Sequence, residues 1–494
     1  MEQDADLFAS PIVCHHYDLE LALRWENDAR IAREDAGKPD EDEDPEIEDP
    51  LVPRHTPDTP PVPAREPSVL HGRAKKNQKK RERERTKRKA AARESLASLA
   101  APAPSPRVLE KAAQSVPLKV NFSAKSFRAT KQRWTGSSKP MPHPLLAHAD
   151  DAEFLKAHLQ YFDWPGELFS QTHALLDRNG YVIGVLVSPP APEEEWSSVV
   201  EHATNAFRSA REKMSFPAAA FQHRRASGEG FPAVAAGFAF GVGRQEVGNI
   251  KASSARNAAA MDELLADPSV GRIATSPVSA MQATCYHIFS DYHEVKQVLL
   301  AKNPHLRRTF PRSPFAAVTA NLGPVSVSPP HTDGNNKADG LCLISALGSF
   351  NPDLGGHLVL WDYNMMVRFP PGCSVLIPSA VVTHSNTPIF AGEERFSLIQ
   401  YSAGALFRWV ANGHQSDLDW YASATAEDLI RREEARKTRC ATALKKFSRW
   451  KDIKVKNFTG RARVEVWDEG DVADFSDLTD VESEGEEPPT KRCK

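Results

Sequence analysis

The sequence lacks the marks of several protein classes. Its 494 residues include only six cysteines, and no two of them form a CxxC pair. This spacing excludes a disulfide framework and a zinc finger or ribbon. No run of about 18 apolar residues occurs, and the first residues lack a basic start followed by an apolar core. We therefore expect a protein of a reducing compartment that is neither secreted nor membrane-spanning.

Two further absences narrow the fold. No internal repeat with a period of about 20–50 residues is apparent, which argues against a solenoid or propeller. The glycine run at residues 237–248 (GFAFGVGRQEVG) is not followed by an apolar helix. A dinucleotide-binding fingerprint needs that helix, so the run predicts a bent strand or a glycine loop instead.

Charge is balanced over the chain but separated into blocks. Against 62 Lys and Arg stand 65 Asp and Glu, for a net charge of -3. Residues 40–49 are acidic, residues 50–67 are rich in proline, and a basic run begins at Arg73 and ends at Lys89. Such segments cannot bury enough apolar surface to fold. We predict disordered tails over residues 1–115 and, at the acidic end of the chain, over residues 456–494.

Eleven of the seventeen residues in the basic run are Lys or Arg. A cluster of this kind binds phosphate or an acidic nuclear import receptor without needing a fold. It therefore predicts nuclear localisation and contact with nucleic acid. The alternative is a solvated charged helix that has no partner.

Between the tails the pattern is globular. Apolar residues recur at helical spacing from Trp196 to Ala210 and from Ile288 to Leu299, which predicts two amphipathic helices that face a core. We interpret residues 116–309 as a helical and mixed part. Short strand-like runs between turn signals follow over residues 310–413, a spacing typical of a β-sandwich or jelly-roll. A basic helix capped by Thr425 is predicted within residues 414–455.

Residues that can bind a metal stand out in this β-rich part. His331 and Asp333 lie two positions apart at a predicted strand end, so their side chains point to one face. His384 follows the apolar run SVLIPSAVV. Two imidazoles and one carboxylate form the facial triad of non-haem Fe(II) oxygenases and leave positions open for a 2-oxo acid and O2. His148 and Asp150 have the same spacing in a polar loop, so the spacing alone means little.

Arg395 and Ser397 extend this interpretation. A guanidinium can bind the distal carboxylate of 2-oxoglutarate through two parallel hydrogen bonds. Ser397 lies two positions further on the same strand and can donate another hydrogen bond. Each of these residues alone could be structural, and a zinc or nickel cupin shares the metal ligands. The order of all five favours an Fe(II) and 2-oxoglutarate enzyme.

The segment from about residue 310 to 413, with SPPHTDGNN, LGGHLVLWDY, RFPPGCSVLIPSA and HSNTPIFAGEERFSLIQYSAGALFRWV, resembles the TET/JBP-type dioxygenases, in particular their fungal branch. Weaker similarity begins near Val116. The resemblance implies an α+β fold with a double-stranded β-helix core flanked by helices. It also implies that His331, Asp333 and His384 bind Fe(II), while Arg395 and Ser397 bind 2-oxoglutarate.

The same resemblance implies a DNA substrate. Asn336 stands where relatives hydrogen-bond a flipped base, and Tyr401 stands where they stack an aromatic ring on it. Relatives that oxidise 5-methylcytosine often carry a histidine where this chain has Ala403, which leaves the preferred base open between 5-methylcytosine and N6-methyladenine. The expected function is oxidation of methylated bases in duplex DNA. The alternatives are hydroxylation of a protein or small molecule and an inactive chromatin-binding relative.

Overall fold

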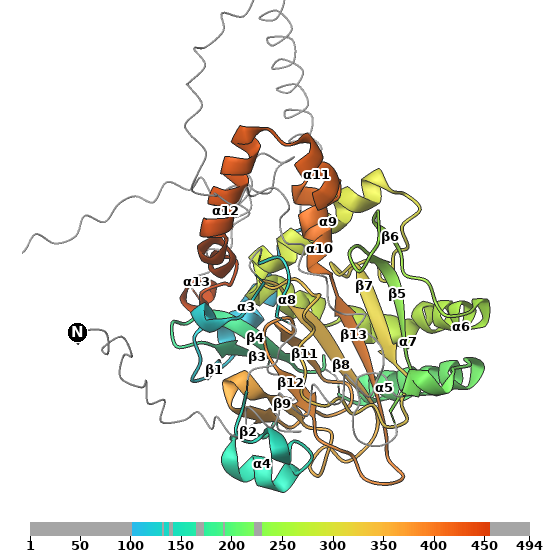
Figure 1. Cartoon of the computed structure of the whole chain (residues 1–494). Helices are drawn as coiled ribbons and strands as arrows, with labels where there is room; N and C mark the ends of the chain where they lie inside the picture. Colours follow the sequence, from blue (N-terminus) through green and yellow to red (C-terminus); the bar gives the residue numbers. More distant parts are fainter. Residues whose placement is uncertain are drawn as a thin grey trace, which may run out of the picture. The chain divides into compact units, whose positions relative to one another are not determined.

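The computed structural model describes residues 101–130, 133–137, 142–164, 172–190, 193–221 and 230–454. Three predicted segments lie outside these residues: the basic run at 73–89, the tail at 456–494 and most of the tail at 1–115. All described residues belong to one unit, Val69–Lys494. Figure 1 shows a mixed α+β architecture whose labels are used below.

A nine-stranded sheet forms the largest element. Its strands run in the order β1 (Leu118–Lys119), β3 (His173–Leu176), β4 (Val182–Val187), β11 (Ser374–Ile377), β8 (Cys342–Ser349), β13 (Glu394–Tyr401), β7 (Ala317–Asn321), β5 (Ala233–Ala239) and β6 (Gly248–Asn249). All neighbours are antiparallel except β1 and β3. The strands predicted within residues 310–413 are thus joined by five strands from residues 118–249.

A smaller sheet has the order β12 (His384–Asn386), β9 (Leu358–Leu360), β10 (Met365–Val367) and β2 (Gln160–Phe162). Side chains on β9 and β10 alternate between two apolar clusters, as the period of two along a strand requires. Leu358, Leu360 and Met365 join the main core together with residues of the large sheet. Val359 and Met366 face the opposite way and pack under α4 (Ala152–His158).

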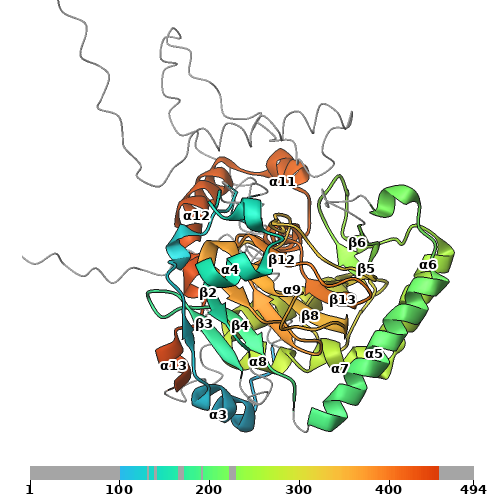
Figure 2. The ribbon, with the colours of Figure 1, turned by 90° about the horizontal axis from the view of Figure 1, so that it is seen from below.

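Helices cover the outer face of the large sheet. Phe396 and Leu398 of β13 pack with Val199, Ala203 and Phe207 of α5 (Glu193–Lys213). Figures 1 and 2 show α5, α6 (Ala255–Ala266) and α7 (Pro268–Thr275) together on this side. The apolar stripe predicted for α5 is therefore confirmed. The layers run from helices through the large sheet and a shared core to the small sheet and α4.

The remaining helices connect and close the fold. The second predicted helix is confirmed as α9 (Tyr286–Lys302), whose stripe from Ile288 to Leu299 is buried. The predicted cap of the C-terminal helix is also confirmed, because Thr425 and Asp428 form a capping box at α12 (Ala426–Lys445). The others are α8 (Val278–Thr284), α10 (Gly404–Ala411), α11 (Asp417–Ser423) and α13 (Trp450–Lys454). None of the helices in the described residues is both long enough and apolar enough to cross a membrane.

One boundary of the predicted tail is wrong. Residues 101–115 were expected to be disordered, but α3 (Pro106–Gln114) lies within them. Ser105 caps this helix by accepting a hydrogen bond from the Val108 amide, and Pro106 begins it. Ala112 is buried against the main core. Tertiary contact thus orders a segment whose composition alone matched the tail. The other predicted segment boundaries stay predictions.

Candidate metal and carboxylate site

The two histidines and the aspartate of the sequence pattern come together. Nε2 of His331 lies 3.8 Å from Oδ1 of Asp333, and Nε2 of His384 lies 4.0 Å from Oδ2 of the same carboxylate. One ligand atom from each residue falls within 4.8 Å of the other two. Two imidazoles and one carboxylate on one side of a common point fit a divalent iron with further positions open.

Backbone carbonyls hold both rings in the orientation that metal binding needs. Nδ1 of His331 lies 2.7 Å from the Pro329 carbonyl, and Nδ1 of His384 lies 2.9 Å from that of Val382. A carbonyl only accepts, so each Nδ1 carries the proton and each Nε2 keeps its lone pair. This is the usual support for metal-binding histidines. The rings are only 4.4 Å apart between centroids.

Pairing between distant segments places the ligands. The backbones of His331 and His384 exchange two hydrogen bonds, of 3.1 and 2.9 Å, as an isolated antiparallel bridge beside β12. The Asp333 amide donates to the Ser379 carbonyl at 2.9 Å. Residues 133–137 lie along the same turn, because Gly136 donates to Gly334 at 2.7 Å. No sequence pattern predicted the contact made by residues 133–137.

Arg395 is a buried cation without an acid. Its side chain is 1% exposed and Nη1 donates to the Ser326 carbonyl at 2.6 Å. Among the described residues Nε has no hydrogen-bond partner, and no carboxylate forms an ion pair with the guanidinium. Burial lowers the pKa of this guanidinium to about 10. A buried charge in this condition calls for an anion.

Two serines lie close to the guanidinium. The Ser326 hydroxyl is also buried and without a partner in the described part of the chain. Ser397 faces the same side of β13 as Arg395, and its hydroxyl accepts a hydrogen bond from Asn321 at 2.9 Å. A carboxylate placed here would find donors that the protein does not use. Ser326 was missed from sequence, although PVSVSPP directly precedes the HTD motif.

The two predicted base-binding residues have different surroundings. The Asn336 amide nitrogen lies 3.1 Å from the Ser379 hydroxyl and 3.5 Å from Asp333 Oδ2. With the nitrogen so engaged, Oδ1 is the atom left for a substrate. Tyr401 is half-buried at the end of β13, and its hydroxyl accepts from Thr319 at 3.4 Å. The backbones of Asn336 and Ala403 form a bridge, which brings the turn and the strand end together.

A buried group of four charges lies directly after Asn336. Lys337 contacts both Asp291 of α9, at 2.9 Å, and Asp339. Lys446, at the end of α12, reaches the same two carboxylates at 2.9 and 3.2 Å. Burial opposes ionisation of Asp339, but the two lysines outweigh it and lower the pKa of this carboxyl. We call these four residues the charge quartet. It joins the turn that carries His331 and Asp333 to two helices, α9 and α12.

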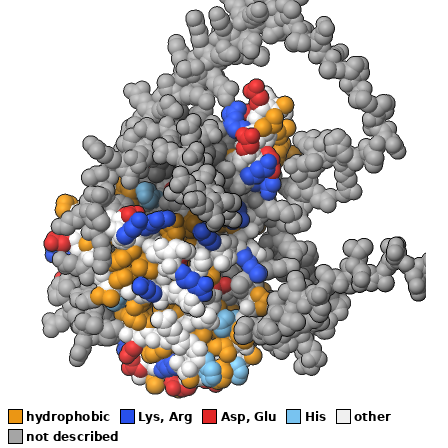
Figure 3. Space-filling model, turned by 90° about the vertical axis from the view of Figure 1, so that its left-hand side faces the viewer, with side chains coloured by type: hydrophobic (Ala, Val, Ile, Leu, Met, Phe, Trp, Pro, Cys, Tyr) orange, Lys and Arg blue, Asp and Glu red, His pale blue; other side chains and the backbone are white. Residues whose placement is uncertain are grey.

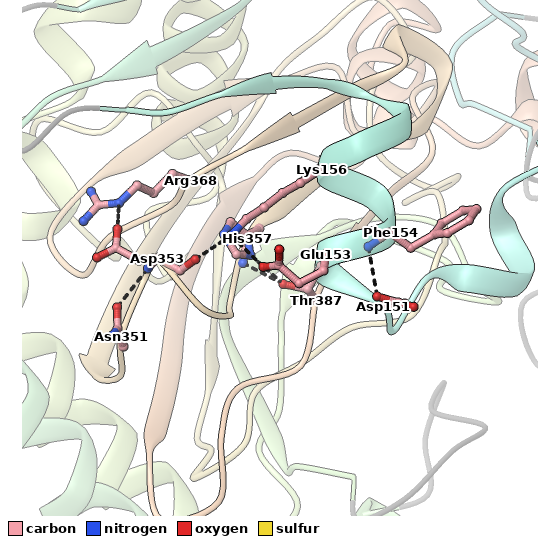
Figure 4. A network of polar contacts seen from close by, with 9 residues as sticks. All are labelled: Asp151, Glu153, Phe154, Lys156, Asn351, Asp353, His357, Arg368 and Thr387. Carbon is pink, nitrogen blue, oxygen red and sulfur yellow. Dashed lines mark hydrogen bonds and ion pairs between the residues drawn. The ribbon is translucent and has the colours of Figure 1, made fainter.

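A second polar network lies on the outer side of the small sheet (Figure 4). His357 is fully buried, and its Nδ1 lies 3.0 Å from the Thr387 hydroxyl. Lys156 of α4 donates to the Asp353 carbonyl at 2.7 Å, while Arg368 forms an ion pair with the Asp353 carboxylate. Burial lowers the pKa of His357 to about 4. These contacts join α4 to the loop before β9 and involve none of the metal ligands.

Comparison with known proteins adds little. No model of a known protein family matches the sequence, and no curated protein matches it. Among solved structures, "NgTET1 in complex with 5mC DNA" aligns with a TM-score of 0.36 and 14% identity. The alignment covers 53% of this chain and 91% of that one. A likeness this low carries no argument, so the proposals below rest on the side chains.

Proposed function

We propose that this chain is an Fe(II)- and 2-oxoglutarate-dependent dioxygenase that oxidises methylated bases in DNA. The observation that carries the proposal is the pairing of two sites. A three-residue cluster of His331, Asp333 and His384 lies in the same sheet pair as a buried arginine that pairs with no acid in the described part of the chain. The first suits a metal and the second suits the far carboxylate of a dicarboxylic acid.

The path of the chain supports binding of one ligand at both sites, with one end at the three-residue cluster and the other end at Arg395. A short extended segment leads from Ser326, which accepts from Arg395, to His331. On the way Ser328 accepts from the Asn386 amide at 2.9 Å. Five residues of extended chain span at most roughly 17 Å. The Arg395 guanidinium contacts the first residue of this segment, and His331 is its last residue. Arg395 and the metal ligands can therefore act on one small molecule.

We further propose that the two sheets form a double-stranded β-helix. The central strands of the large sheet have the order β7, β13, β8 and β11, and those of the small one have the order β12, β9 and β10. The His331 bridge extends the small sheet on the far side of β12. The chain passes from one sheet to the other and back along this order, as two interleaved turns of a β-helix require. Membership of the TET/JBP group and of its fungal branch is part of the same proposal.

Bound iron would supply the activation of O2 with conversion of 2-oxoglutarate to succinate and carbon dioxide. The protein's own residues then have separate tasks. Pro329 and Val382 fix the histidine tautomers through their carbonyls. Arg395 neutralises the distal carboxylate, with Ser326 and Ser397 as further partners. Arg395, Ser326 and Ser397 are buried, and the exclusion of water around them would strengthen their contacts with the carboxylate.

The DNA part of the proposal rests on other residues. A methylated base in a duplex must leave the stack to reach a buried site. Tyr401 offers a ring for stacking, and Oδ1 of Asn336 offers an acceptor for an exocyclic amino group. Oxidation of the 5-methylcytosine methyl would leave a stable hydroxymethyl group. Oxidation of N6-methyladenine would give a hemiaminal that loses formaldehyde.

Exposed cations would complement phosphate. Figure 3 shows separate Lys and Arg side chains over the face that carries β1, β3 and α13. Exposed residues of these elements and their loops include Lys119, Lys125, Arg128, Arg178 and Arg449. The basic run at residues 73–89 would add a tether to DNA and a contact for a nuclear import receptor. We therefore propose a nuclear location.

One observation favours a second candidate, hydroxylation of a protein or small molecule. The Asn336 amide nitrogen already bonds Ser379 and approaches Asp333. The side chain thus has a structural task that would suit any substrate. An inactive chromatin-binding relative fits less well, because the metal ligands and Arg395 are intact.

The test is mass spectrometry of nucleosides from duplex DNA that contains 5-methylcytosine and N6-methyladenine. The purified protein is incubated with Fe(II) and 2-oxoglutarate, and succinate is measured alongside. We expect hydroxymethylcytosine or loss of N6-methyladenine, abolished in His331→Ala. His148→Ala is the matched control, since exposed His148 and Asp150 share the spacing of the ligands. Succinate without a change in any nucleoside would move the function to the second candidate. Equal activity of His331→Ala would refute the metal site.

A further inference from the structure

The loop between β5 and β6 combines a strained backbone with an exposed apolar tip. Val242 has a φ of 52° between Gly241 at 100° and Gly243 at 74°. A β-branched residue rarely adopts this left-handed region, at a cost on the order of 1–3 kcal/mol. The Val242 side chain is nevertheless 63% exposed, so burial in the chain's own core does not offset that cost.

Both ends of the loop are held firmly. Phe240 and Val247 are buried in the main core, and the Phe240 ring lies 4.5 Å from that of Trp409 in α10. The Arg244 guanidinium folds back onto the Asn249 carbonyl at 3.2 Å. Asn249 in turn accepts from the Arg307 amide at 2.7 Å. The tip is therefore a fixed projection on two buried anchors.

Contacts through the start of α10 connect the base of this projection to the turn that carries Asn336. Tyr401 pairs with Ala317 of β7, and Ala317 pairs with Gly237 of β5. Two strand spacings separate Tyr401 from β5, which is about 10 Å. A Cβ built on Gly241 would lie 3.2 Å from the Ala405 side chain at the start of α10. The neighbouring Gly404 amide donates to Asn335, next to the base-binding candidate Asn336. Figure 1 shows β5, β6 and α10 at the same end of the sheet.

Exposed cations lie in and next to the loop and on the segment that contacts Asn249. Arg244 and Lys251 flank the tip in sequence, while Lys302 and Arg308 lie on the segment that Asn249 holds. All four are exposed, and none forms an ion pair with another described residue. Glu246 is the acidic residue within the loop. An apolar tip among cations matches a nucleic acid, whose bases are apolar on their faces and whose backbone is anionic.

We propose that Val242 is a wedge that enters the base stack of duplex DNA and fills the space of the base that has left it. This inference rests on the proposed function. Proteins that unstack a duplex insert apolar side chains between base steps, and a rigid mounting is what allows the side chain to do so. The strained conformation presents the valine outward at the end of two anchored strands. A single-stranded substrate would have no stack to open, so the wedge would matter for duplexes alone.

The experiment compares turnover of one methylated strand in duplex and single-stranded form. We expect Val242→Asn to lower the ratio of duplex to single-strand kcat/KM about tenfold, because unstacking costs a few kcal/mol and a wedge offsets part of it. Asparagine tolerates the left-handed conformation, so the loop keeps its shape. Val242→Leu should restore most of the ratio. Leu354→Asn is the matched control, since Leu354 is 49% exposed in the loop before β9, away from the proposed DNA contacts.

A second readout separates the wedge from general damage. Fluorescence of 2-aminopurine beside the methylated base should rise when the unaltered protein binds and rise less with Val242→Asn. An unchanged ratio in Val242→Asn, or equal loss on both substrates, would overturn the wedge while leaving the proposed function standing. If the unaltered protein modifies no base in either form, the proposed function fails and the inference falls with it.

Discussion

Two buried cationic centres in this protein show opposite arrangements. Lys337 and Lys446 meet the carboxylates of Asp291 and Asp339 in the charge quartet, which is neutral within itself. Arg395 is equally buried, yet no described acid pairs with it and its Nε has no partner. Stability alone favours the first arrangement, because a buried charge without a partner lowers the free energy of unfolding. The contrast fits a structural role for the charge quartet and supports the anion-binding role proposed above for Arg395.

The largest expected effect comes from breaking the quartet. Lys337→Met would leave two buried carboxylates with one lysine, and we expect it to lower the free energy of unfolding by about 3–5 kcal/mol. Urea denaturation measures this. Arg395→Met is the matched variant and should change stability by less than about 1 kcal/mol in either direction, since it removes a charge that has no acid. Equal destabilisation by both variants would contradict the comparison.

The next effect tests whether Arg395 binds an anion. With a metal bound, 2-oxoglutarate at a hundred times its Kd should raise the free energy of unfolding by about 2.7 kcal/mol. Arg395→Met should abolish this gain, and Arg395→Lys should keep only part of it because an ammonium cannot form two parallel hydrogen bonds. Thermal unfolding with and without the ligand provides the measurement. A full gain in Arg395→Met would assign the carboxylate to other residues.

A third effect concerns pH. Burial lowers the pKa of His357 from 6.5 to about 4. As the solution is acidified, this side chain therefore binds a proton at a higher pH in the unfolded chain than in the folded one. Stability should therefore fall by roughly 2 kcal/mol between pH 6.5 and pH 4.5 on account of this residue. The Asp339 carboxyl opposes this trend little in that range, because Lys337 and Lys446 hold its pKa below its usual value.

Comparing His357→Asn with the unaltered protein isolates the histidine contribution. Asparagine can retain the hydrogen bond to Thr387 but does not titrate. Its stability should decline less steeply with acid, as followed by denaturation at several pH values. Identical slopes for the two proteins would place the pH dependence elsewhere.

The smallest expected effect concerns the helix that carries Lys446 to the charge quartet. Thr425 caps α12, the helix whose end brings Lys446 to the quartet. Thr425→Ala should cost about 1 kcal/mol of stability. Thr438→Ala is the matched control, since Thr438 is exposed in the middle of the same helix and alanine is the better helix former. A larger loss in the control would exclude capping as the cause.

Several elements followed from local patterns. The apolar period of α5 and α9, the capping box of α12 and most strands between β7 and β13 were predicted in the right place. These patterns report which side of a segment is buried, and that information is local. The order of His331, Asp333, His384 and Arg395 also pointed to one site, and the structure brings the three metal ligands together.

Other elements depended on contacts between distant residues. β12 is three residues long and exists through its pairing with β9 and its bridge to His331. Asp291, one of the partners of Lys337, lies 46 positions earlier on α9. Gly136 contacts Gly334, which is nearly 200 positions away in the sequence. No local period encodes such pairings.

The sequence by itself determined which residues could bind metal, which faces of α5 and α9 are apolar and where α12 begins. Only the tertiary structure decided that Arg395 pairs with no acid among the described residues, that Asn336 also contacts Asp333 and that Val242 is exposed in a left-handed conformation. The physical reason is that a side chain's chemistry is a property of its type, whereas its partners, its burial and its access to a ligand are set by segments far away in the chain.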